Sequence, residues 1–183
     1  GDYRQPTLQA ACWQVCTCIS EGVIMGYRSD VKFIVAFPSE TLRDEVLAIY
    51  SMHPKVQELD LASQWVKYEE TDTYYRGDGF KHSSEKEKFN LTAYVLVYDD
   101  EHVKWYPDYI DVQAVEHMFE VIKMRAEKDD EFPFAWKRIR VGEEVGDIEV
   151  DTNYNDDCLT SDLLDTFLDD RFYVSTNIEC ELK

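Results

Sequence analysis

A nearly continuous apolar run from Val31 to Phe37 limits the possible folds of this chain more than any other feature. A strand with one face in water alternates apolar and polar residues, whereas a buried strand can be apolar along its whole length. Pro38 ends the run, because proline has no backbone N–H to donate to a sheet. The sequence therefore predicts a buried strand over residues 31–37.

Helices and strands are predicted after this run. Ser39 can cap a helix that ends before Pro54, and the clearest helical spacing of apolar residues covers 112–128. Strands are predicted over 64–76, 89–98 and 134–141, the first two forming a hairpin around the polar loop 77–88. From residue 31 to 141 the order is β-α-β-β-α-β, which predicts an α+β fold with a ferredoxin-like, split βαβ core.

Further elements are predicted on either side of this core. Apolar residues at helical spacing predict a helix over residues 6–25. Residues 142–183 are predicted to form an acidic β-α-β unit, with strands near 146–151 and 171–182 and a helix near 160–170. At 183 residues the chain suits one α+β domain, with a core over about 31–141.

Negative charge is concentrated near the C-terminus. The net charge is −19, and residues Val141 to Lys183 contain thirteen acidic and two basic residues. Like charges repel one another in a compact fold. Direct binding to DNA, RNA or anionic membranes is disfavoured, because phosphates would be repelled. The charge instead favours a basic protein partner, in particular one that handles nucleic acid.

Two acidic clusters are predicted to bind this partner. The helix near 160–170 has leucines on one side and aspartates, without any lysine, on the other. A second cluster, from Tyr98 to Asp111, mixes acids with aromatic rings. The alternative for each cluster is a solvated surface that has no specific partner. The predicted partner-binding residues are Asp99, Asp100, Glu101, Trp105, Tyr106, Asp108, Tyr109, Asp156, Asp157, Asp162, Asp165, Asp169 and Asp170.

Two patterns in the sequence resemble sites of chemistry. Residues 151–162 resemble an EF-hand calcium loop in spacing, but Asp156 stands where that loop needs glycine, so an acidic turn before a helix is the preferred interpretation. Cys12-Trp13 resembles the nucleophile region of papain-like thiol hydrolases, although packing of Cys12 in the interior is preferred. No catalytic residue, metal ligand or cofactor is predicted.

The five cysteines, an odd number, indicate a reduced, cytoplasmic protein, and no secretory leader or membrane-spanning run is recognised. The composition resembles that of two classes of small acidic proteins: phage anti-defence inhibitors, which include anti-CRISPR proteins, and immunity proteins that neutralise bacterial toxins. We expect an inhibitor that blocks a basic, nucleic-acid-binding partner, and DNA mimicry is one mode by which it would do so. The first alternative is an immunity protein, and the second is a hydrolase that uses Cys12.

Overall fold

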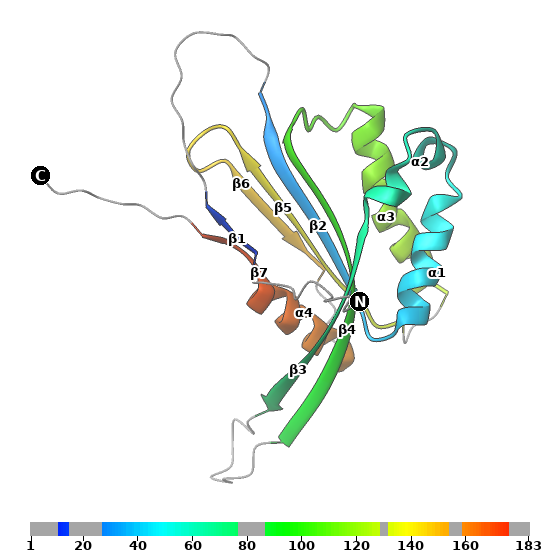
Figure 1. Cartoon of the computed structure of the whole chain (residues 1–183), viewed down its shortest axis with the longest axis vertical. Helices are drawn as coiled ribbons and strands as arrows, with labels where there is room; N and C mark the ends of the chain where they lie inside the picture. The colour runs from blue at the N-terminus through cyan, green and yellow to red at the C-terminus, as the bar shows by residue number, and fades with distance from the viewer. Residues whose placement is uncertain (1–10, 15–26, 77–86, 129–131, 154–158, 176–183) are drawn as a thin grey trace, which may run out of the picture.

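The computed structural model of the protein describes residues 11–14, 27–76, 87–128, 132–153 and 159–175 (Figure 1). These residues form a mixed α+β structure with four α-helices, a short 3₁₀ turn η1 and seven strands. In chain order the elements are β1 (Ala11–Gln14), β2 (Ser29–Phe37), α1 (Glu40–Ser51), α2 (Pro54–Glu58), η1 (Leu61–Gln64), β3 (Val66–Arg76), β4 (Glu87–Val103), α3 (Ile110–Ala126), β5 (Ala135–Gly142), β6 (Ile148–Thr152), α4 (Leu159–Arg171) and β7 (Phe172–Ser175).

A five-stranded antiparallel sheet organises the fold, with the strand order β3-β4-β2-β5-β6. The central strand β2 pairs with β4 on one side and β5 on the other, so that Phe33 lies opposite both Tyr98 and Arg138. Every residue from Val31 to Phe37 is buried. The predicted buried strand is therefore confirmed.

Each face of this sheet is covered by different helices. On one face, β2 residues Val31, Phe33 and Val35 pack in a core that includes Val115 and Met118 of α3 and residues of α1. On the other face, Ile34 and Ala36 pack with Leu164, Phe167 and Leu168 of α4. In Figure 1, α1, α2 and α3 lie together on one side of the sheet, and α4 lies on the other.

Several local predictions are confirmed. The Ser39 side chain accepts a hydrogen bond from the Leu42 backbone N–H at 3.3 Å and caps α1. The predicted hairpin is the antiparallel β3–β4 pair, whose register runs from Val66 opposite Val97 to Arg76 opposite Glu87. Helices α3 and α4 lie within two residues of the predicted bounds.

The predicted helix over residues 6–25 is wrong where the structure describes it. Residues 11–14 form strand β1, which pairs in parallel with β7, so that Ala11 lies opposite Phe172. Residues that follow a helical period locally can still join a sheet when a distant strand supplies hydrogen-bond partners. The other residues of the predicted helix lie outside the described part of the chain.

The acidic C-terminal segment does not form its own sheet. Strand β6 adds to the large sheet beside β5, whereas β7 pairs with β1 in a separate two-stranded sheet. Residues 176–182 of the predicted last strand lie outside the described residues.

Within the described ranges, no helix is both long enough and apolar enough to span a membrane.

Candidate functional site

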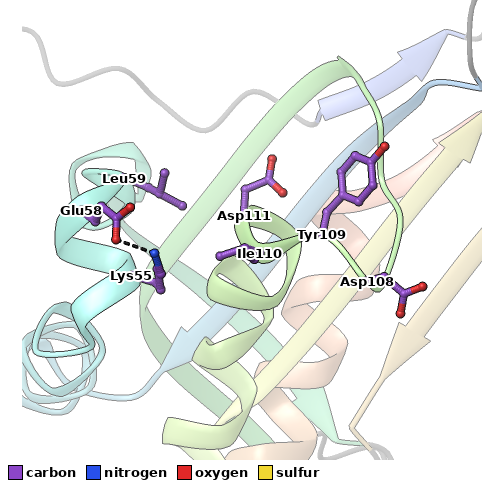
Figure 2. A pocket seen from close by; sticks show the side chains of 7 residues that line it. All are labelled: Lys55, Glu58, Leu59, Asp108, Tyr109, Ile110 and Asp111. Atoms are coloured by element: carbon purple, nitrogen blue, oxygen red, sulfur yellow. Dashed lines mark hydrogen bonds and ion pairs between the residues drawn. The ribbon is translucent and has the colours of Figure 1, made fainter.

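Two neighbouring clefts lie where α3 begins. We call the first the α2–α3 groove; it has a volume of about 530 Å³ and is lined by Lys55, Glu58, Leu59, Asp108, Tyr109, Ile110 and Asp111. Figure 2 shows these side chains at the end of α2, on the segment that leads into α3 and on the first turn of α3. Segments about 50 residues apart in the sequence therefore meet at one surface.

Local hydrogen bonds fix both walls of the groove. Pro54 opens α2, and the His53 Nδ1 atom accepts a hydrogen bond from the Lys55 backbone N–H at 3.3 Å. On the opposite wall, the Tyr109 N–H donates to the Tyr106 carbonyl at 2.9 Å, which forms a turn before α3. Asp111 lies in the first turn of α3, where the helix dipole favours a negative charge.

The groove is net negative and partly apolar. Its lining contains three carboxylates and one ammonium group, and that ammonium, Lys55 Nζ, is 2.5 Å from the Glu58 carboxylate. Asp108 and Asp111 are exposed and form no ion pair with the described residues. Tyr109 and Ile110 also face solvent, with 42% and 58% of their surface accessible. The surface thus combines accessible apolar area with two carboxylates, Asp108 and Asp111, that have no cation within ion-pair distance among the described residues.

The second cleft, which we call the β4 cleft, has a volume of about 350 Å³ and shares Tyr109 and Asp111 with the groove. The carboxylates of Asp100 and Asp111 in its lining are balanced by the cations of Arg28 and Lys104. The lining of the β4 cleft also contains aromatic and aliphatic side chains: Tyr98, Trp105, Val112 and Val115. This cleft therefore lacks the excess negative charge of the groove.

One of the residues that line the β4 cleft, Tyr98, has a buried phenol. The Tyr98 hydroxyl donates a hydrogen bond to the Asp100 carboxylate at 3.1 Å. Burial raises the pKa of Tyr98 far above its usual value, and the negative charge of Asp100 raises that pKa further. The Tyr98 phenol therefore stays protonated at physiological pH and donates its hydrogen bond to Asp100.

A bulge in β4 shapes the edge of this cleft. Between Ser29 and Val31 the β2–β4 register shifts, and His102 adopts a left-handed backbone conformation with φ of 57°. The Asp30 carboxylate accepts a hydrogen bond from the His102 N–H at 2.8 Å, and Arg28 donates to the His102 carbonyl at 2.7 Å. Asp30 and Arg28 thus hold His102 in its left-handed conformation.

The predicted segment from Asp99 to Tyr109 is divided between several roles. Asp99 forms an ion pair with Lys32 at 2.7 Å, and Trp105 packs against Phe33 in the core with ring centroids 5.6 Å apart. The Tyr106 hydroxyl donates to the Tyr27 carbonyl at 3.3 Å. Glu101 is exposed but lines neither cleft. The predicted residues that line the two clefts are Asp100, Trp105, Asp108 and Tyr109.

The predicted acidic residues of α4 lie on the other face of the sheet. Asp169 is exposed but lies 2.6 Å from Lys137, whose side chain is largely buried, so this carboxylate forms an ion pair within the chain. Asp165 is half-buried, and burial together with the charges of Asp169 and Asp162 raises its pKa to about 6. Asp162 and Asp170 are exposed. The structure therefore does not join the two predicted clusters into one surface, and Asp156 and Asp157 lie outside the described residues.

The calcium-like and thiol-hydrolase-like patterns have other roles within the described residues. The Asp151 carboxylate pairs with Arg138, and the Asn153 side chain accepts a hydrogen bond from the Trp136 N–H at 2.5 Å. Two side chains of the calcium-like spacing, Asp151 and Asn153, thus already contact residues of β5. Cys12 lies in β1, so the helix N-terminus invoked to activate its thiol is absent there. Among the described residues, no group of three or more histidine, cysteine, aspartate or glutamate side chains could hold a metal ion.

Lys55, Glu58, Leu59 and Ile110 were missed as site residues in the sequence. The signal that could have found them is the apolar pair Leu59 and Ile110, since each lies next to charged residues at the end of a helix. Only the packing of α2 against α3 brings them together.

No protein-family model and no curated protein matches the chain. Among solved structures, a phage SAM lyase in the apo state is similar, with a TM-score of 0.33 and 8% sequence identity, over 75% of this chain and 98% of that chain. A phage SAM lyase in complex with S-methyl-5'-thioadenosine has a TM-score of 0.34 and 7% identity, over 74% of this chain and 100% of that chain. At this level of similarity, neither structure bears on what this chain binds.

Proposed function

We propose that this chain is an acidic binding protein that docks on a basic protein partner and blocks it. The observation that carries the proposal is the α2–α3 groove, where Asp108 and Asp111 form no ion pair with any described residue and lie beside the exposed ring of Tyr109. Carboxylates attract lysine and arginine, and a tyrosine ring adds contact area at low entropic cost. A partner that handles nucleic acid would present the cations that such a surface needs.

The use of cations elsewhere in the fold supports the same proposal. Several basic side chains are held in ion pairs within the chain: Lys32, Arg43, Lys55, Lys67, Arg125, Lys137, Arg138, Arg140 and Arg171. A cation that already contacts a carboxylate does little to neutralise another surface. Within the groove lining itself, the one cation, Lys55, is paired with Glu58, so Asp108 and Asp111 leave this lining with a net negative charge.

The experiment compares two variants of equal charge. Asp108→Asn/Asp111→Asn changes the groove, and Asp162→Asn/Asp170→Asn changes exposed positions on α4, so each brings the net charge from −19 to −17. Binding of a fluorescent nona-arginine peptide is measured by anisotropy at low and high NaCl. We expect the groove variant to bind roughly three- to tenfold more weakly at low salt, because each surface ion pair is worth up to about 1 kcal/mol.

The α4 variant should bind nearly as well as the wild type. An equal loss of affinity in both variants would show that the peptide responds only to net charge. An affinity that is the same at low and high NaCl would remove the electrostatic basis of the proposal.

The finer layout of the fold is proposed as well. Residues 29–142 run β2-α1-β3-β4-α3-β5, with α2 and η1 inserted after α1, and their strands lie in the order β3-β4-β2-β5. This arrangement supports a ferredoxin-like, split βαβ unit to which β6 and α4 are added.

A further inference from the structure

The α2–α3 groove exposes more apolar surface than an electrostatic contact requires. Leu59, Tyr109 and Ile110 all line it and have 38%, 42% and 58% of their surface accessible. Single exposed apolar residues are common, but several around one groove indicate a place for a partner. We propose that the groove receives the apolar side of a basic amphipathic helix that belongs to the partner. This inference rests on the proposed function and names the segment that is recognised.

The shape of the groove favours a helix over an extended segment. None of its seven lining residues belongs to a strand; they lie in α2, in α3 and in the turns at their ends. An extended peptide usually gains affinity by adding to a sheet edge, and this groove offers none. A helix satisfies its own backbone hydrogen bonds and needs only an apolar groove for its side chains.

The charges around the groove select a basic helix. In Figure 2, Asp108 and Asp111 lie near Tyr109 and Ile110 on one wall, and Lys55 turns toward Glu58 on the other. An apolar centre bordered by carboxylates fits a helix with leucines on one side and lysines or arginines next to them. A second copy of this chain is a poor occupant, because both copies would carry a net charge of −19.

Two peptides of equal composition provide the test. Each has about 16 residues, or roughly four helical turns, and contains only leucine, lysine and alanine. In the amphipathic peptide the leucines follow i, i+3, i+4 and i+7 spacing, and in the scrambled peptide they do not. We expect the full-length protein to bind the amphipathic peptide at least about tenfold more tightly than the scrambled one.

Leu59→Ser/Ile110→Ser should remove the difference in affinity between the amphipathic and the scrambled peptide, and it should leave the affinity for the scrambled peptide unchanged. The matched control is Val145→Ser/Val150→Ser, which removes two exposed apolar side chains at 91% and 48% accessibility away from the groove. This control should retain the full preference for the amphipathic peptide. Thermal melting of every variant checks that the fold is intact.

Each other outcome has a distinct meaning. Equal binding of the two peptides would overturn the helix inference, and the proposed function would stand if Asp108→Asn/Asp111→Asn still weakened binding. A loss of preference in both serine variants would also overturn it, because the groove would not be the site. A wild-type dimer that Leu59→Ser/Ile110→Ser converts to a monomer would assign the groove to a second copy. Failure to bind either peptide would overturn the inference and the proposed function together.

Discussion

Single carboxylates in this protein differ widely in their surroundings. Asp44 lies beside Arg43 and Lys67, and these hydrogen-bonding cations hold its pKa below the usual value. Asp165 has the opposite surroundings: it is half-buried, and its nearest charged neighbours include Asp162 and Asp169. Acidic residues that look alike in the sequence are thus stabilising at one position and unfavourable at another.

Asp165 gives a pH-dependent prediction. Its pKa of about 6 in the folded chain lies above the value of about 3.9 in an unfolded chain. Protonation therefore favours the folded state; this contribution is complete below about pH 4 and is lost as the pH rises through 6. Asp165→Asn cannot ionise, so we expect it to stabilise the fold by about 1 kcal/mol at pH 7.5 and by nearly nothing at pH 4.

Urea unfolding of the wild type and the variant at several pH values measures this difference. Asp170→Asn is the control, because it removes an exposed carboxylate from the same helix and is not among the causes of the Asp165 shift. Its effect should stay within about 0.5 kcal/mol without a step near pH 6. A difference for Asp165→Asn that is constant from pH 4 to 8 would contradict the assigned pKa.

Among the elements, α4 is the main helical cover for one face of the large sheet. Leu164, Phe167 and Leu168 are almost completely buried there against Ile34 and Ala36 of β2. At the end of α4, Arg171 reaches back to Glu70 and Asp72 of β3, at 2.9 and 2.7 Å. The acidic helix is therefore fastened to the sheet by apolar packing and by ion pairs.

Phe167→Ala should destabilise the protein by about 3–5 kcal/mol, because it removes a fully buried ring and leaves a cavity between α4 and the sheet. Thr166→Ala, at the exposed neighbouring position, should change stability by less than about 0.5 kcal/mol. Chemical denaturation with both tryptophan fluorescence and circular dichroism measures the effect. A loss below 1 kcal/mol for Phe167→Ala would mean that α4 contributes little to the folded sheet.

Elements stabilised by nearby residues could be predicted from the sequence, and those that depend on distant partners could not. The burial of Val31–Phe37 and the Ser39 cap follow from local pattern and composition. Strand β1 could not be predicted, because its partner β7 lies about 160 residues further along the chain. Likewise, β4 continues through Asp99 to Val103 only because β2 pairs with it there.

The candidate site was predictable only in part. Asp108 and Tyr109 were predicted from the mixture of acids and aromatic rings, and both line the groove. The opposite wall, Lys55 to Leu59, follows from the packing of α2 against α3 and has no motif of its own. The internal role of Asp169 was equally hidden, since its partner Lys137 is 32 residues away on β5.

For the whole molecule, short internal ion pairs compete with long-range repulsion. The net charge of −19 is spread over a single small protein, and several cations lie within 3 Å of a carboxylate, as in the Lys32–Asp99 and Lys137–Asp169 pairs. Salt screens charges that are further apart than about 10 Å at 0.1 M, but it weakens a partly buried contact much less. Added salt should therefore reduce the repulsion more than the attraction.

We accordingly expect the melting temperature to rise by roughly 2–6 °C between low and high NaCl, since 1 kcal/mol corresponds to about 2–4 °C for a chain of this size. Thermal unfolding followed by circular dichroism over an NaCl series measures the shift. Glu143→Gln/Glu144→Gln removes two exposed charges in the turn between β5 and β6, which lowers the net charge to −17. This variant should melt higher than the wild type at low salt and gain less from added salt. A melting temperature that falls as salt is added would show instead that the ion pairs outweigh the repulsion. The excess of acidic residues would then not destabilise the fold.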